Sequence, residues 1–147
     1  MRSRISDFEI RRILSEYRVI AVVGLSRDPS KDSYRVAEYL KRNGFKVIPI
    51  NPKTSRILDE ACYGSLLEVP VEVQREIEII NIFRPSDQVL PIVEQAIQIR
   101  KSFGKPYVIW MQLGVINELA AEIAEENGLI VVMDRCIMRE HKRFFGS

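Results

Sequence analysis

The sequence contains little cysteine, little histidine and little excess charge. It has two cysteines, one histidine and a formal net charge of +2 over 147 residues. Cys62 and Cys136 cannot form a disulfide framework and lack metal-ligand spacing, so we expect reduced thiols and a cytoplasmic protein. The near-neutral balance argues against binding to nucleic acid or to a membrane surface, which usually needs a basic excess.

Long apolar runs are also missing. No run approaches the roughly 18–20 residues of a membrane span, and the N-terminal sequence MRSRISDFEIRRIL lacks the apolar core of a signal peptide. The chain is nevertheless 46% hydrophobic, too apolar for a disordered protein. A length of 147 residues predicts one domain. A domain of this size buries about 70% of its unfolded surface and needs no metal or disulfide.

Short apolar runs alternate with amphipathic segments along the whole chain. The runs predict strands over residues 19–23, 46–50, 77–83, 107–111 and 130–133. The other segments predict helices over residues 6–17 (within an N-terminal segment 1–17), 33–43, 84–103 and 117–127 and in the tail 134–147. This alternation is typical of βαβ units. We therefore predict a single α/β domain over residues 1–147, a Rossmann-like doubly wound parallel sheet of five to six strands with helices on both faces.

Local signals refine this prediction. We expect Ser6 or Asp7 to cap the first helix and Ser33 to cap the second. In the first helix, the predicted inner face is Phe8, Ile13, Leu14 and Tyr17. Pro49 lacks a backbone donor and predicts an end or edge position for its strand. Residues 54–76 are less regular, with a short strand and turn expected around 56–63.

In doubly wound sheets, ligands bind beyond the carboxyl ends of the strands, where the strand order reverses. This rule selects four segments, Gly24–Ser33, Asn51–Lys53, Phe83–Pro85 and Gln112–Gly114. In the first segment only Gly24 of the dinucleotide pattern G-x-G-x-x-G is present. The hydroxyls of Ser26 and Ser33 and the free N–H groups of the following helix could still hold a phosphate. An ordinary connection between a strand and a helix explains the same residues.

The other strand ends carry basic and polar groups. Proteins that bind NAD place an acid after the second strand, whereas Lys53 stands here, which suits a phosphate on a ribose. Arg84 can face a phosphate bidentately and Phe83 can pack on adenine. Gln112 could hydrogen-bond an amide-bearing arm of a ligand. The alternatives are a solvated Lys53, a core position for Phe83 and a surface position for Arg84.

Three stretches, residues 20–53, 78–97 and 108–141, carry the motifs V-V-G-x-S, N-P-K, F-R-P, W-x-Q-x-G and D-R-C-I in this order. In these motifs the chain resembles the small stand-alone CoA-binding proteins. It is also similar to the CoA-binding Rossmann domain of succinyl-CoA synthetase alpha subunits and of ADP-forming acyl-CoA synthetases. Leu58-Asp59, where the family pattern has Leu-Gly, and the longer Ser102–Pro106 segment depart from it.

The resemblance implies a site for coenzyme A or an acyl-CoA. It places Gly24, Ser26, Arg27, Ser33 and Tyr34 near the phosphates, and Asn51, Pro52 and Lys53 near the nucleotide and its ribose phosphate. Phe83 and Arg84 would lie along the adenine or the pyrophosphate. Leu25, Lys31 and Gln112 complete the predicted site.

The large synthetases carry a further domain with a phosphorylated histidine, for which this chain has no room. Its one histidine, His141, lies in a basic tail that reads as a solvated helix face, with Ile137, Met138 and Phe144 turned inward. No set of Ser, His and Asp and no metal cluster is evident. We therefore expect a carrier, sensor or accessory module for CoA rather than a complete enzyme, with no catalytic or metal-binding residue.

A protein partner such as an acyltransferase or synthetase, and a homodimer, are left open by the sequence. Two enzymatic alternatives remain. The first is thiol and disulfide chemistry between CoA and Cys62 or Cys136. The second is an NADP-linked oxidoreductase, which fits Lys53 but lacks the glycine fingerprint.

Overall fold

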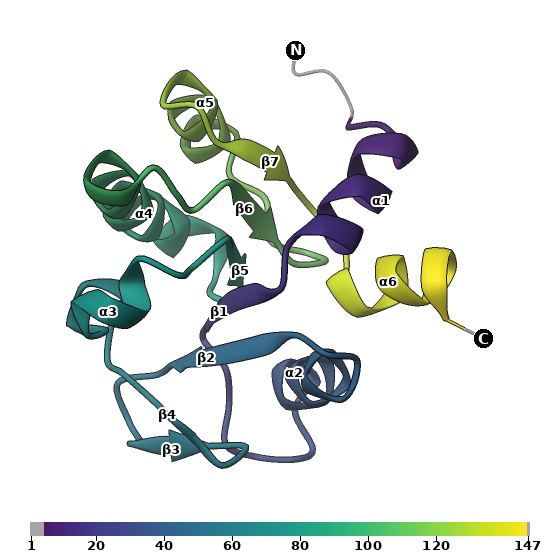
Figure 1. Ribbon diagram of the computed structural model, residues 1–147, viewed down its shortest axis with the longest axis vertical. Coiled ribbons are helices and arrows are strands. Elements are labelled where there is room, and N and C mark those ends of the chain that lie inside the picture. Colours follow the sequence, from purple (N-terminus) through teal and green to yellow (C-terminus); the bar gives the residue numbers. More distant parts are fainter. Residues whose placement is uncertain (1–4, 147) are drawn as a thin grey trace.

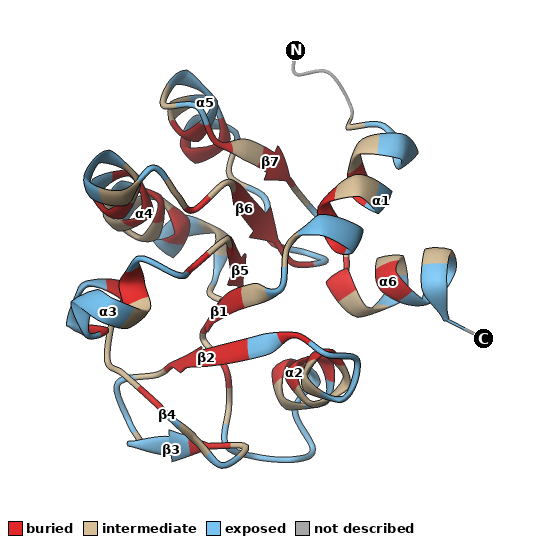
Figure 2. Cartoon of the chain, in the orientation of Figure 1, coloured by how far each residue is buried: buried red, intermediate tan, exposed pale blue. Residues whose placement is uncertain are grey.

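The computed structural model describes residues 5–146, and its centre is a five-stranded parallel sheet (Figure 1). The strand order is β2-β1-β5-β6-β7. From one edge to the other these strands are β2 (Lys46–Ile50), β1 (Val19–Val23), β5 (Ile79–Ile82), β6 (Val108–Met111) and β7 (Ile130–Val132). Most of their residues are buried (Figure 2), as expected for parallel strands covered on both faces. The predicted Rossmann-like fold is confirmed.

Helices cover both faces of this sheet. One face carries α4 (Val89–Phe103) and α5 (Glu118–Glu126), with η1 (Leu66–Glu68) in the same core and the short α3 (Val71–Gln74) beside it. The other face carries α1 (Asp7–Glu16), α2 (Asp32–Arg42) and α6 (Ile137–Phe145). Residues of one strand alternate between the two cores, since Ala21 packs with α4 and Val22 with α2. Within residues 5–146, no helix combines the length and apolar character needed to cross a bilayer.

The irregular stretch does not add a sixth strand to the sheet. It forms a separate antiparallel hairpin of β3 (Arg56–Ile57) and β4 (Glu60–Ala61). After the hairpin, Tyr63 forms an isolated parallel bridge to Ile50 at the end of β2. This bridge returns the chain to the edge strand, and Pro49 lies on that edge strand as predicted.

Two predicted details of the helices are wrong. Ser6 does cap α1, because its hydroxyl accepts from the Glu9 N–H at 3.1 Å. Phe8, however, is 78% exposed. Ile10 is fully buried and takes the place on the inner face of α1 that was predicted for Phe8. Ser33 does not cap α2, which begins at Asp32 after Lys31 and has no side-chain cap. The Ser33 hydroxyl instead accepts from the backbone N–H of Ser26, seven residues earlier.

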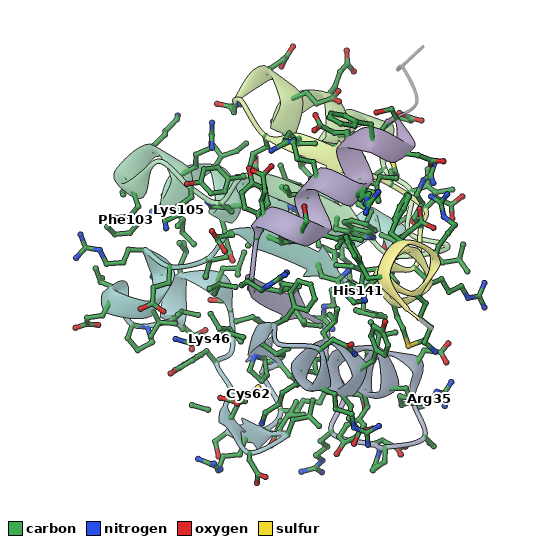
Figure 3. The ribbon with its side chains drawn as sticks, turned by 45° about the vertical axis from the view of Figure 1, so that its right-hand side comes forward. Arg35, Lys46, Cys62, Phe103, Lys105 and His141 are labelled. Atoms are coloured by element: carbon green, nitrogen blue, oxygen red, sulfur yellow. The ribbon has the colours of Figure 1, made fainter. Side chains whose placement is uncertain are left out.

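His141 does not lie on a solvated face, which corrects another prediction. It is 8% exposed, and its Nδ1 lies 2.7 Å from the Tyr39 hydroxyl on α2. Phe45 and Phe145 pack around the ring, and Figure 3 shows His141 between α6 and the rest of the fold. Burial, and to a lesser extent the charge of Arg18, lower the pKa of His141 and so favour the neutral ring. This side chain fastens α6 to the domain.

The strand order reverses between β1 and β5. The chain passes from β1 to β2 on one side and then crosses back to β5 on the other. A crevice at this switch point is where doubly wound sheets bind ligands. Gly24 follows β1 and Phe83 follows β5, so these two segments form the edge where a ligand is expected.

After β5, a short 3-10 helix, η2 (Ser86–Gln88), leads into α4.

Candidate functional site

Gly24 lies at the switch point in a conformation that favours glycine. Its φ is +89°, and its backbone N–H donates to the Ile50 carbonyl at 3.0 Å. A Cβ at this position would lie 3.0 Å from Cδ of Arg84 and 3.3 Å from the carbonyl carbon of Phe83. The absence of a side chain therefore lets the end of β1 approach the end of β5 closely.

We expect Gly24→Ala to destabilise the protein more than Gly44→Ala. Gly44 has the same φ of +89°, but nothing lies within 4 Å of its added Cβ. The control variant therefore adds only backbone strain, about 1–2 kcal/mol. Gly24→Ala also displaces Arg84, and overpacking of this kind adds about 1–3 kcal/mol. Urea unfolding of both variants measures the difference, and equal losses would show that the contact with Arg84 yields freely.

The loop after β1 is organised by its own hydroxyl groups. The Ser26 hydroxyl accepts from the Asp28 N–H at 3.0 Å, while the Ser26 N–H donates to Ser33 at 2.9 Å. Hydrogen bonds from the backbone and side chain of Ser30 lower the pKa of the Asp28 carboxyl and keep it ionised. The start of α2 has no side-chain cap, so its first N–H groups remain available to an anion.

Asn51 ties the end of β2 to the loop after β1. Its Nδ2 donates to the Leu25 carbonyl at 2.9 Å, and its Oδ1 accepts from the Lys53 N–H at 2.8 Å. Its own N–H donates to the Tyr63 carbonyl at 2.8 Å. The side chain of Leu25 is fully buried, so only its backbone belongs to this edge. Asn51 thus positions the turn that presents Lys53.

A first cleft of about 350 Å³ opens beside this edge. Three predicted residues from three different strand ends, Gly24, Pro52 and Arg84, line it together. The cleft is also lined by residues outside the predicted site, including Gly64, Ser65, Leu66, Asp87, Gln88 and Ile92. The Gly64-Ser65 pair indicates a turn in the sequence. Only the bridge from Tyr63 to Ile50 brings that turn next to Gly24.

A second cleft of about 250 Å³ opens on the α2 and α6 face of the same edge. Two predicted residues, Phe83 and Gln112, line it, together with Asp32, Arg35, Val36, Leu113, Cys136, Met138 and Arg139. Phe83 and Arg84 are consecutive, yet they line different clefts. The two clefts therefore flank the carboxyl end of β5.

The remaining predicted residues line neither cleft. Arg27, Lys31 and Lys53 are exposed, and Tyr34 is half-buried at the start of α2. Ser26 and Ser33 are engaged with each other inside the loop. Whether these residues contact a ligand stays a prediction. Within residues 5–146, no group of His, Cys, Asp or Glu is arranged to hold a metal ion.

Comparison with known proteins assigns this chain to a family. The sequence model of the CoA binding domain family matches residues 18–142 of this chain. The uncharacterized protein YneT of Bacillus subtilis is 35% identical over 136 residues, which cover 92% of this chain and 94% of that protein. A hypothetical protein from Pyrococcus horikoshii OT3 has a TM-score of 0.87 and 38% identity, over 99% of both chains.

A much larger enzyme shares only part of this chain. An ADP-forming acetate–CoA ligase of Archaeoglobus fulgidus is 42% identical over 60 residues, which cover 40% of this chain but 9% of the ligase. The predicted resemblance to ADP-forming acyl-CoA synthetases is thereby confirmed for one segment. The match of the family model over most of the chain shows that this protein belongs to the CoA-binding domain family.

Proposed function

We propose that the protein binds coenzyme A or an acyl-CoA across the carboxyl edge of its sheet, as a carrier or sensor. The observation that carries this proposal is that Gly24, Pro52 and Arg84 come from three strand ends and line one cleft at the switch point. The nucleotide end of CoA would occupy this first cleft. The pyrophosphate would then lie over the loop after β1, near the uncapped start of α2.

The charges at this edge suit a ligand with several phosphates. Arg27, Lys31, Lys53 and Arg84 make no side-chain ion pair among the described residues. Asp28 in the loop after β1 and Asp87, which lines the first cleft, offset part of this charge. No acid follows β2, where NAD-binding proteins hold the ribose hydroxyls. CoA carries a 3′-phosphate on its ribose, and we expect Lys53, which is exposed next to Pro52 of the first cleft, to contact it.

The described residues favour binding over catalysis. The one histidine, His141, forms a hydrogen bond with Tyr39 in the core and holds α6 to the domain. The chain matches only 9% of the acetate–CoA ligase, so that enzyme's activity does not transfer with the domain. A carrier of this kind would deliver its ligand to an acyltransferase or synthetase.

Calorimetric titration tests the proposal with four ligands, namely CoA, dephospho-CoA, NAD and NADP. We expect CoA to bind at least tenfold more tightly than dephospho-CoA, because dephospho-CoA lacks the 3′-phosphate that would form a charged hydrogen bond with Lys53. NAD should bind more weakly still. Equal affinities for CoA and dephospho-CoA would remove the role of Lys53, and tighter binding of NADP would favour a nicotinamide ligand instead.

A further inference from the structure

The second cleft lies where the far end of the proposed ligand would arrive. Arg84 lines the first cleft and its neighbour Phe83 lines the second. A ligand longer than the first cleft can therefore continue over the end of β5. In CoA, the part that extends away from the nucleotide is the pantetheine chain, which contains two amides and ends in a thiol.

Gln112 presents an unused donor to this second cleft. The side chain is 6% exposed, and its Oε1 accepts from the Ile137 N–H and from Asn81 Nδ2, both at 3.3 Å. The backbone N–H of Ile137 can only donate, so the Gln112 atom that faces it must be the amide oxygen. The amide nitrogen of Gln112 is then the end that is free to bind a ligand. Among residues 5–146 no partner is found for that nitrogen.

This nitrogen is not among the buried atoms without a partner, so it reaches the cleft, where a carbonyl oxygen of a ligand can accept from it. The amide carbonyl nearest the thiol of pantetheine is such a group. Behind Gln112, the fully buried Asn81 also has an oxygen, Oδ1, without a partner. Gln112 therefore adds a hydrogen-bond donor to a cleft whose wall also contains apolar side chains such as Val36 and Leu113.

Cys136 lines the same cleft. It is 8% exposed and occupies the N-cap position of α6, where its side chain makes no cap hydrogen bond. Arg35 and Arg139 also line the cleft, and so does Asp32, which pairs with Arg35. The cleft that the pantetheine chain would enter is therefore bordered by a cysteine.

Cys62 is exposed to the same extent, 8%, but it lines neither cleft. It is buried beside the β3–β4 hairpin, well away from Arg35 in Figure 3. Its Sγ donates to the Asn51 carbonyl at 3.5 Å. Burial raises the pKa of the Cys62 thiol, which disfavours the thiolate. The structure thus separates two cysteines that the sequence could not rank.

We propose that Cys136 is a site of reversible disulfide exchange with the thiol end of CoA, with Gln112 donating to the nearest pantetheine carbonyl. The Cys136 thiolate attacks one sulfur of CoA disulfide, forms a mixed disulfide with that half and releases the other half as CoA thiolate. The proton lost by Cys136 passes to solvent or to the released thiolate. CoA disulfide is the only oxidant in the step. This inference rests on the proposed function.

The test is intact-mass measurement of the reduced, folded protein after mixing with CoA disulfide. We expect one CoA equivalent per chain, mapped to Cys136 by peptide digestion and removed by dithiothreitol. The adduct should persist in Cys62→Ser and disappear in Cys136→Ser. Oxidised glutathione should react at least tenfold more slowly, because it lacks the nucleotide that anchors CoA.

Three results would overturn the proposal, namely no adduct, an adduct on Cys62, or equal rates with oxidised glutathione. Titration of the wild-type protein with reduced CoA under reducing conditions separates this failure from that of the proposed function. Binding of reduced CoA without an adduct overturns the exchange alone. Absence of both overturns the CoA site as well.

Discussion

Replacing Lys53 with glutamate is expected to weaken CoA binding by about 10- to 100-fold. Lys53 is exposed, and its backbone N–H is held by Asn51 at the end of β2, next to Pro52 in the first cleft. A hydrogen bond to a charged group contributes about 1.5–3 kcal/mol, and each 1.4 kcal/mol is about a tenfold change in affinity. Dephospho-CoA lacks the 3′-phosphate, so the same variant should change its affinity much less. Calorimetry on both ligands measures this selectivity.

Lys101→Glu is the matched control for this prediction. Lys101 is an exposed residue in the last turn of α4. This end of the helix leads to the start of β6, so it lies toward the amino ends of the strands, opposite the proposed site. The control makes the same change of charge far from the proposed site, so CoA affinity should stay within about twofold at 0.15 M salt, where such distances are screened. Equal losses in both variants would reduce the effect to net charge. No loss at Lys53 would reassign it as a surface lysine.

Replacing Trp110 with alanine is expected to lower the free energy of unfolding by about 3–5 kcal/mol. Trp110 is fully buried in β6, in the core formed with α1, α2 and α6. Its Nε1 also donates to the Arg135 carbonyl at 2.8 Å, next to Cys136. The stability of a domain is about 5–15 kcal/mol, so this loss is a large fraction of the total. Urea unfolding followed by circular dichroism measures it without needing tryptophan fluorescence.

Trp110→Phe separates packing from the hydrogen bond. It retains most of the apolar contact but leaves the Arg135 carbonyl without its donor, which costs about 1–3 kcal/mol. We expect a loss clearly smaller than that of the alanine variant. If the alanine variant loses less than about 1 kcal/mol, the core around β6 must collapse around the gap and the assigned packing would be wrong.

The strands were predictable because their signal is local. The continuous apolar run of residues 19–23 coincides with β1 as the structure has it. Asn117 and Gly104 mark helix ends through their own side chain or backbone freedom, and both hold these positions in the structure. Motif order along the chain was also sufficient to identify the family.

Contacts between distant segments were not predictable in the same way. The Ser33 hydroxyl was expected to cap its own helix, but the fold of the loop brings the Ser26 N–H to it instead. His141 stands among charged residues in the sequence, yet Tyr39 and Phe45 arrive from α2 and the β2 segment to bury it. In both cases the deciding partner comes from elsewhere in the fold.

By itself, the sequence determined the α/β class, most element positions, the family and the strand ends Gly24, Pro52 and Arg84 that line the first cleft. These follow from short-range patterns of hydrophobicity, turn residues and motifs. Only the tertiary structure decided that Gly64 and Ser65 join that cleft, that Phe83 and Arg84 face different clefts, and that Cys136 rather than Cys62 lines one. Such choices depend on which segments the sheet order and the two helix layers bring together, and that pairing is set by packing of the whole domain.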